Sequence, residues 1–182
     1  MAFGEGFQRV LSAAQADAPW AYEQLYRSLS PAVCGYLRLR GAADPDDLTS
    51  EVFLGAFRGI GSFSGDEEQF RAWVFTIAHR RLTDERRAVA CRPRPADCEL
   101  PDRPGGDVEE EALRRLSAER VRALCTGLAG DQGDVLLLRL VSGLTVDAVA
   151  GILGKTPGAV KALQRRGVAA IRRQLEREGV PL

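Results

Sequence analysis

The sequence predicts an all-α protein with two small helical domains joined by a flexible acidic linker, and three observations favour this class. Apolar residues recur at helical spacing through most of the chain, and no segment alternates in the manner of a strand. A stretch from about residue 90 to residue 109 is rich in proline, glycine and acids, and it has neither helical nor strand periodicity. The 182 residues, 45% of them hydrophobic, suffice for one or two small cores.

These signals divide the chain into a first domain, a linker and a second domain, over residues 1–88, 89–110 and 111–182. In the first domain, helical periodicity predicts helices over residues 6–16, 19–40, 46–60 and 69–87. The third of these helices has the clearest start, because Asp44 is a favourable N-cap and Pro45 suits the first helical position.

The third helix has an apolar half and a narrow polar strip opposite it. Leu54 lies in this strip beside Asp47, Glu51 and Arg58. One exposed leucine is normal on a protein surface. The alternative is a docking strip with an apolar anchor for a basic protein partner.

The fourth helix carries a face without acids, bordered by Trp73. This face holds Thr76, His79, Arg80, Thr83, Arg86 and Arg87. A basic strip edged by an aromatic ring suits phosphate contacts and stacking on an unpaired base, and the glycine-rich loop at residues 61–66 is suited to receive an extruded base. The alternative is that Trp73 belongs to the core.

In the second domain, residues 145–173 are typical of a helix-turn-helix. Gly154 suits the end of its first helix, and Thr156 and Pro157 suit the N-cap and first position of its second. On the second helix the apolar side consists of Val160, Leu163, Gly167 and Ile171, and the outward side of Lys161, Gln164, Arg165, Val168 and Arg172. Such a helix fits a major groove. The alternative is an ordinary helical pair with solvated cations.

The net charge is zero, with 25 basic and 25 acidic residues, but the charges are segregated. Basic blocks at residues 71–94 and 155–177 flank an acidic block at residues 97–111. No apolar run approaches the roughly 18 residues of a membrane helix, and no secretory signal is present. We therefore expect a cytoplasmic protein with no membrane insertion.

Cysteine and histidine usage argues against a metal site, a cofactor and an enzyme. The four cysteines form no C-x-x-C pair, and His79 is the one histidine. No nucleophile accompanies His79, so we expect no catalytic residues. A redox switch between Cys91 and Cys98, which flank a proline-rich stretch, is the alternative to free thiols.

Three segments in order, DPDDLTSEVFLGAFRGIGSF, FRAWVFTIAHRRLTDERR and DQGDVLLLRLVSGLTVDAVAGILGKTPGAVKALQRR, resemble the extracytoplasmic-function sigma factors. These form the small two-domain branch of the sigma-70 family, and the resemblance covers nearly the whole chain. It implies that the first domain is sigma region 2 and the second is sigma region 4. It also implies reversible binding to core RNA polymerase, direction of that enzyme to promoter DNA and, as in many members, inhibition by an anti-sigma factor.

The resemblance also assigns site residues by position. Core polymerase binding falls on Asp47, Leu48, Glu51 and Leu54. Reading and melting of the minus ten element fall on Ser62, Phe63, Ser64, Trp73, Thr76, Arg80, Thr83, Arg86 and Arg87. Reading of the minus thirty-five element falls on Thr156, Gly158, Lys161, Ala162, Gln164, Arg165 and Arg166.

One departure from the family pattern affects promoter sequence. Many members have Ser-Arg-Leu after the recognition-helix lysine, whereas this chain has Ala162, Leu163 and Gln164. A frequent arginine contact is therefore absent, and readout shifts to Gln164 and Arg165.

Two other classes of protein stay open from the residues alone: a dimeric helix-turn-helix repressor or activator, and a nucleic-acid enzyme.

Overall fold

The computed structural model describes residues 6–90, 123–124, 128 and 130–178. All regular elements in these residues are helices, which confirms the all-α class. They are α1 (Phe7–Gln15), α2 (Pro19–Leu39), α3 (Pro45–Gly59), the 3-10 helix η2 (Ile60–Ser62), α4 (Glu67–Ala90), α6 (Asp131–Leu140), α7 (Val146–Leu153) and α8 (Pro157–Arg177). Residues 89 and 90 of the predicted linker belong to α4, and the rest of the linker lies outside the described residues. The domain boundaries therefore stay predictions.

The helix ends follow the signals expected from the sequence. The Asp44 carboxylate accepts hydrogen bonds from the backbone N–H groups of Asp46 and Asp47, and it thereby caps α3. Thr156 caps α8 in the same way, through the N–H of Ala159 at 3.2 Å. Gly154, which ends α7, has the left-handed φ of 62° that glycine tolerates best.

The fourth helix starts two residues earlier than predicted, because a reciprocal cap precedes it. The Gln69 N–H donates to Asp66 Oδ1 at 2.8 Å, and the Asp66 N–H donates to Gln69 Oε1 at 2.9 Å. This capping box satisfies two helix-terminal donors and fixes the chain direction as it leaves the preceding loop.

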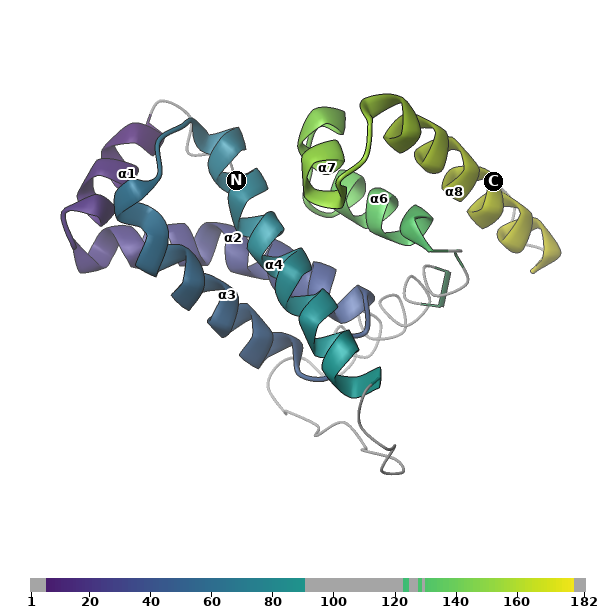
Figure 1. Cartoon of the computed structure of the whole chain (residues 1–182), viewed down its shortest axis with the longest axis horizontal. Helices are drawn as coiled ribbons and strands as arrows, with labels where there is room; N and C mark the ends of the chain where they lie inside the picture. The colour runs from purple at the N-terminus through teal and green to yellow at the C-terminus, as the bar shows by residue number, and fades with distance from the viewer. Residues whose placement is uncertain (1–5, 91–122, 125–127, 129, 179–182) are drawn as a thin grey trace.

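Helices α1 to α4 form the N-terminal bundle, and α6 to α8 form the C-terminal bundle (Figure 1). Helix α8 approaches α6 closely at Gly167, where a Cβ atom would lie 2.8 Å from Leu136 Cδ1. Glycine at this position therefore permits the close packing of α8 on α6.

The two bundles share one continuous core. Helix α7 packs against α4, and α6 packs against α2 (Figure 1). Six consecutive residues of α6, from 133 to 138, are buried, so this short helix is covered on all sides. A helix covered all round needs neighbours on every face. The C-terminal bundle supplies some of them, and the N-terminal bundle supplies the others.

Candidate nucleic-acid interface

The polar strip of α3 reaches the surface at most of its predicted positions. Asp47 is exposed, and Leu54 is exposed over 56% of its surface. Glu51 is half-buried, and its Oε2 lies 3.0 Å from Nη1 of Arg81 on α4. Leu48 is different, because it is 8% exposed and lies in the core. Its side chain supports the strip from beneath and does not reach the surface.

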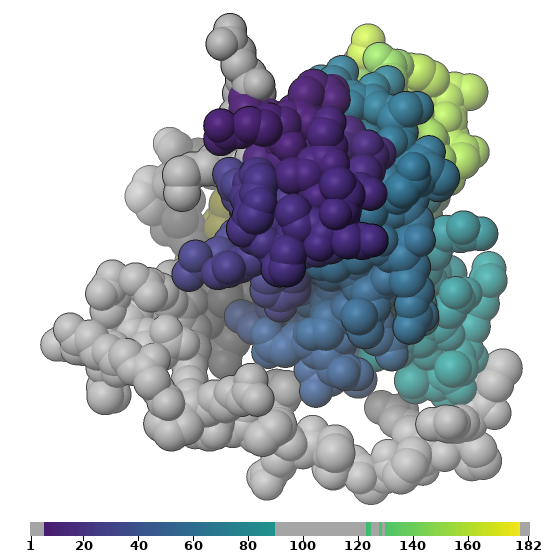
Figure 2. Space-filling model, turned by 90° about the vertical axis from the view of Figure 1, so that its left-hand side faces the viewer, coloured from purple at the N-terminus to yellow at the C-terminus, as the bar shows by residue number. Residues whose placement is uncertain are grey.

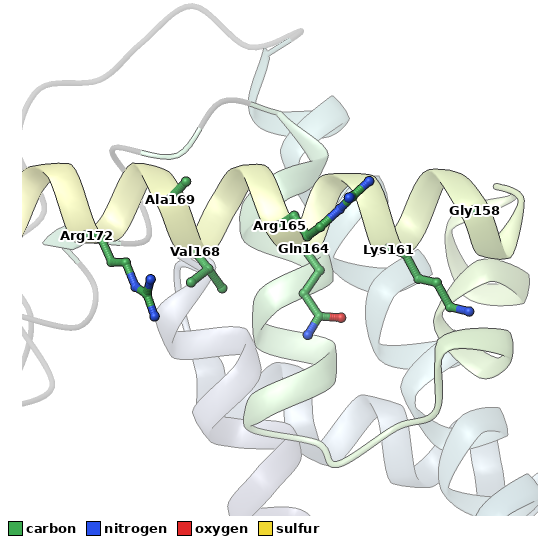
Figure 3. A pocket seen from close by; sticks show the side chains of 7 residues that line it. All are labelled: Gly158, Lys161, Gln164, Arg165, Val168, Ala169 and Arg172. Carbon is green, nitrogen blue, oxygen red and sulfur yellow. The ribbon is translucent and has the colours of Figure 1, made fainter.

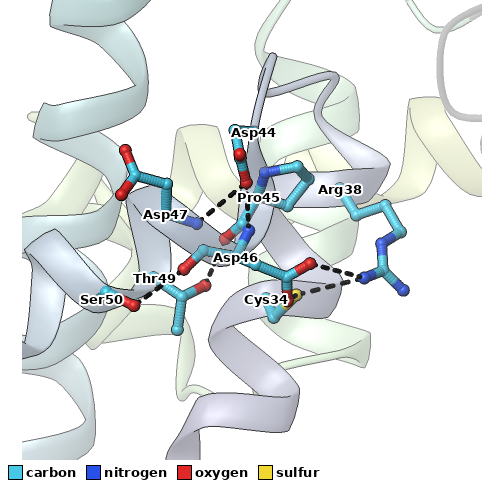
Figure 4. A network of polar contacts seen from close by, with 8 residues as sticks. All are labelled: Cys34, Arg38, Asp44, Pro45, Asp46, Asp47, Thr49 and Ser50. Carbon is cyan, nitrogen blue, oxygen red and sulfur yellow. Dashed lines mark hydrogen bonds and ion pairs between the residues drawn. The ribbon is translucent and has the colours of Figure 1, made fainter. Parts of the chain in front are cut away.

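A polar network fixes the start of this strip. Asp44 caps the helix, Thr49 donates to the Pro45 carbonyl at 2.6 Å, and the Cys34 thiol donates to Asp46. Burial, the main cause, raises the pKa of Cys34, so the thiol stays protonated at neutral pH. Figure 4 shows the Asp47 carboxylate pointing away from these contacts. It is therefore available to a partner.

The predicted basic face of α4 has its cations outside and its threonines turned inward. Arg80, Arg86 and Arg87 are exposed. Thr76 and Thr83 are half-buried, and their hydroxyls donate to the carbonyls of Ala72 and His79, each at 2.8 Å on the same helix. The face therefore presents guanidinium groups, which bind phosphate through several N–H donors at once.

Trp73 is half-buried and belongs to an aromatic cluster. Its ring stacks on Phe63 with centroids 5.0 Å apart and an interplanar angle of 21°. Phe70 contacts both rings. A Cβ at Gly59 would lie 3.1 Å from the indole, so the absence of a side chain there leaves room for the ring. Trp73 therefore joins the loop after α3 to helix α4.

Serines 62 and 64 on that loop are exposed, and their neighbours are held in place. The Ser62 hydroxyl donates to the Gly59 carbonyl at 2.9 Å. Two glutamines of α1, Gln8 and Gln15, donate to loop carbonyls. The sequence prediction did not include these glutamines, because only their contacts 45 to 57 residues away distinguish them from other surface amides.

Helix α8 has the two sides that its sequence predicts. Val160 and Gly167 are buried, whereas Lys161, Arg165 and Arg166 are exposed. Figure 3 shows Lys161, Gln164 and Arg172 extending from the same side of the helix. This side lines an open hollow of about 830 Å³, and the lining residues of α8 are Gly158, Lys161, Gln164, Arg165, Val168, Ala169 and Arg172.

The remaining predicted residues of α8 lie near its start. Thr156 is exposed but uses its hydroxyl oxygen as the N-cap, and Gly158 is exposed without neighbours at the Cβ position. Ala162 is half-buried beside Lys161. The first turn of α8 therefore leaves its backbone accessible to solvent. A helix that enters a groove of DNA needs an accessible first turn.

Sequence reasoning missed an ionic cluster between the two bundles. Asp134 of α6 is 6% exposed, and its Oδ1 lies 2.6 Å from Nε of Arg40. The Arg40 Nη2 donates to Oδ2 at 2.9 Å. The Tyr36 hydroxyl donates to Asp134 at 3.3 Å and lies 2.9 Å from Nδ1 of His79. Asp134 thus connects α6 with α2 and, through Tyr36, with α4.

His79 is half-buried in this cluster, and burial is the main cause that lowers its pKa. Asp134 and Asp131 oppose this shift, whereas Arg40 and Arg86 reinforce it. The same burial raises the pKa of Tyr36 above its ordinary value, so its hydroxyl keeps its proton.

The lowered pKa of His79 predicts a pH dependence of stability. Because the folded-state pKa lies below the unfolded value of about 6.5, neutral His79 contributes stability above that pH. The contribution is lost as pH falls through the folded-state pKa. We expect His79→Gln to reduce the loss of unfolding free energy between pH 7.5 and 5.5, measured by urea denaturation. Parallel pH profiles for the two proteins would contradict this assignment.

In the described ranges, no three His, Cys, Asp or Glu side chains gather as metal ligands. Cys34 is a free thiol, whereas Cys91 and Cys98 lie outside the described residues. None of the described helices combines the length and the hydrophobicity that a bilayer crossing requires.

Comparison with known proteins matches this chain to one family. Residues 25–90 match the family Sigma-70 region 2. BldN of Streptomyces coelicolor, an ECF RNA polymerase sigma factor, is 34% identical over 168 residues, covering 89% of this chain and 63% of BldN. This chain therefore spans just under two thirds of the length of that relative. ShbA of Streptomyces griseus, another ECF sigma factor, is 32% identical over 133 residues, covering 70% of this chain and 69% of ShbA.

The fold is likewise that of a solved protein. CnrH, in its complex with the cytosolic domain of CnrY, superposes with a TM-score of 0.69 at 22% identity, covering 92% of this chain and 95% of CnrH. That likeness supports the helical fold, and the two sequence relatives carry the assignment. The chain belongs to the ECF sigma factors of the sigma-70 family.

Proposed function

We propose that this protein binds core RNA polymerase and directs promoter-specific initiation of transcription. The α3 strip of Asp47, Glu51 and Leu54 serves as the docking surface for the polymerase. The α4 face and the loop before it open and read the minus ten element, and α8 reads the minus thirty-five element. The observation that carries this proposal is the pair of exposed arginine-bearing helix faces, one on each bundle, in a chain of this family.

The aromatic pair beside the loop accounts for opening of the minus ten element. Extruding a base costs a few kcal/mol, and stacking on an aromatic surface returns about 1–3 kcal/mol per base. The Phe63 and Trp73 pair, flanked by exposed Ser62 and Ser64, provides such a surface. The polymerase supplies the rest of the melting energy.

The packing of the two bundles on one core affects how the free protein binds promoter DNA. About 17 base pairs between the two elements, a typical spacing in this family, span about 58 Å at ~3.4 Å per pair. In the free protein, however, the two modules pack against each other on one core. We therefore infer that the free protein binds promoter duplex poorly and that core polymerase makes it competent by holding the bundles apart.

An anti-sigma protein is a further proposed partner, as the family resemblance implies. The accessible α3 strip, with Leu54 as apolar anchor, is the surface it would occlude. Purification from the native host tests this, because a protein that co-purifies with the chain and suppresses its activity is expected. A chain that is constitutively active and purifies alone would contradict it.

Run-off transcription with purified bacterial core enzyme on genomic promoter fragments tests the function. Specific transcripts are expected only when the chain is added. A stable dimer that binds palindromic duplex without polymerase would instead indicate a conventional helix-turn-helix regulator.

Two substitutions separate the DNA-reading steps in that assay. Arg165→Ala is expected to weaken recognition of the upstream element by about 1–3 kcal/mol, because it removes a base-reading side chain. Trp73→Ala is expected to slow melting more than initial binding. Arg177→Ala, a change of an exposed arginine in the last turn of α8, is the matched control. Equal effects of Arg165→Ala and Arg177→Ala would refute the α8 assignment.

A further inference from the structure

Two glutamines of α1 bind the loop that precedes α4. The Gln15 Nε2 donates to the carbonyl oxygens of Ile60 and Phe63, at 3.0 and 2.7 Å. The Gln8 Nε2 donates to the carbonyl of Gly65 at 2.9 Å. The two N–H bonds of the Gln15 amide are thereby both used. These contacts connect the first helix of the chain to residues that follow it by 45 to 57 positions.

The spacing of the glutamines matches the length of the loop. Gln8 and Gln15 are seven residues apart, so they lie on one face of α1, about 10 Å from each other along the axis. Gln15 meets the start of the loop and Gln8 meets its end, so the loop runs antiparallel to α1. In Figure 2 the purple atoms of α1 lie directly against the blue atoms of the residues that follow it in the bundle.

Other contacts also hold the loop at its two ends. The Phe63 N–H closes the η2 turn on the Ile60 carbonyl at 3.1 Å, and the Asp66 and Gln69 capping box starts α4. At Gly65 a Cβ would lie 2.6 Å from Gln69 Oε1, so the cap is tight. The carbonyls of Phe63 and Gly65 receive donors from α1.

We propose that Gln8 and Gln15 are positioning residues that hold the loop at residues 61–66 in the conformation that receives a promoter base. The proposal rests on the proposed function of that loop. The glutamines act through the loop backbone and through Phe63, whose ring stacks on Trp73. A base-receiving surface that is already ordered binds its base without a further entropic cost for ordering the loop.

The variants Gln15→Met, Gln15→Glu and Gln8→Met test this proposal. Both glutamines are exposed, so the helix tolerates the changes. Methionine removes the donors while keeping the length of the side chain. Glutamate has nearly the same shape, but its carboxylate places negative charge against two carbonyl oxygens, so it is expected to be the more severe change. Gln24→Met, at an exposed glutamine of α2, is the matched control.

The first measurement uses the free protein. Amide hydrogen exchange is expected to accelerate about fivefold for each lost hydrogen bond, at Phe63 in the Gln15 variants and at Asp66 in Gln8→Met, since a hydrogen bond contributes on the order of 1 kcal/mol. Exchange in α2 and α8 should not change. Unchanged exchange at Phe63 and Asp66 would overturn the proposal, whether or not the protein acts in transcription.

The second measurement uses the complex with core polymerase on a promoter that carries 2-aminopurine in the minus ten element. Gln15→Glu is expected to slow the fluorescence rise by about tenfold, with unchanged affinity for core polymerase and unchanged melting temperature. A parallel loss of stability, polymerase affinity and fluorescence would show a merely structural role and would overturn the proposal. No fluorescence rise with the unsubstituted protein would instead count against the function proposed above, and exchange at Phe63 would still decide the role of the glutamines.

Discussion

Replacing Asp134 by alanine is expected to separate the two bundles in the free protein. In the closed form the Arg40 side chain is 13% exposed, and its guanidinium binds both carboxylate oxygens of Asp134. Removing one partner of a buried ion pair costs about 3–5 kcal/mol, because the other charge stays desolvated. In an open form Arg40 is solvated and this cost disappears. The equilibrium should therefore shift towards the open form by at least about a hundredfold.

Small-angle scattering and duplex binding measure this shift. The radius of gyration of Asp134→Ala should increase, and its affinity for promoter duplex without polymerase should rise. Asp131→Ala is the matched control, because the Asp131 carboxylate pairs with Lys155 inside the C-terminal bundle at 2.6 Å. The double variant Asp134→Leu with Arg40→Met should close again, since an apolar pair needs no charge partner. A compact Asp134→Ala protein would show that the ion pair does not hold the bundles together.

Replacing Leu54 by glutamate is expected to give the largest loss of polymerase binding. Leu54 is exposed over 56% of its surface and is the apolar anchor of a strip that also holds Asp47 and Glu51. Buried apolar anchors commonly contribute 2 kcal/mol or more to an interface, so affinity should fall at least about thirtyfold. The added negative charge beside Asp47 and Glu51 should leave folding intact, because Leu54 lies outside the core.

Titration of fluorescent chain with core polymerase checks this loss. Val89→Glu, at an α4 residue exposed over 61% of its surface, is the matched control. It introduces the same charge on a different helix. If Leu54→Glu and Val89→Glu bind the polymerase equally well, the docking surface lies elsewhere on the protein.

Local signals made most of the fold predictable from the sequence. The caps at Asp44 and Thr156 and the left-handed Gly154 are properties of a few neighbouring residues, so they are visible in the chain itself. The two sides of α8 follow from helical periodicity for the same reason. Leu48 shows the limit of assignment by position, because the resemblance places it at the polymerase surface and the structure places it in the core.

Contacts between distant parts of the chain were not predictable. Asp134 stands in the first turn of α6, where an acid normally faces water, yet the structure buries it beside Arg40 of α2. His79 appeared to be one of several polar residues on the basic face, yet it lies beside Tyr36. Gln8 and Gln15 gave no signal at all, because a surface glutamine and a loop-binding glutamine look alike in sequence.

The distance between the bundles, followed by fluorescence energy transfer during titration with core RNA polymerase, tests the central claim most directly. The labels are placed at Glu68→Cys on α4 and Asp147→Cys on α7, both at exposed positions of helices that pack against each other in the free protein, after the natural cysteines have been replaced by serine. High transfer is expected in the free protein. Saturable loss of transfer is expected as polymerase binds and holds the bundles apart for promoter elements about 58 Å from each other. Transfer that stays high at saturating polymerase would contradict the account.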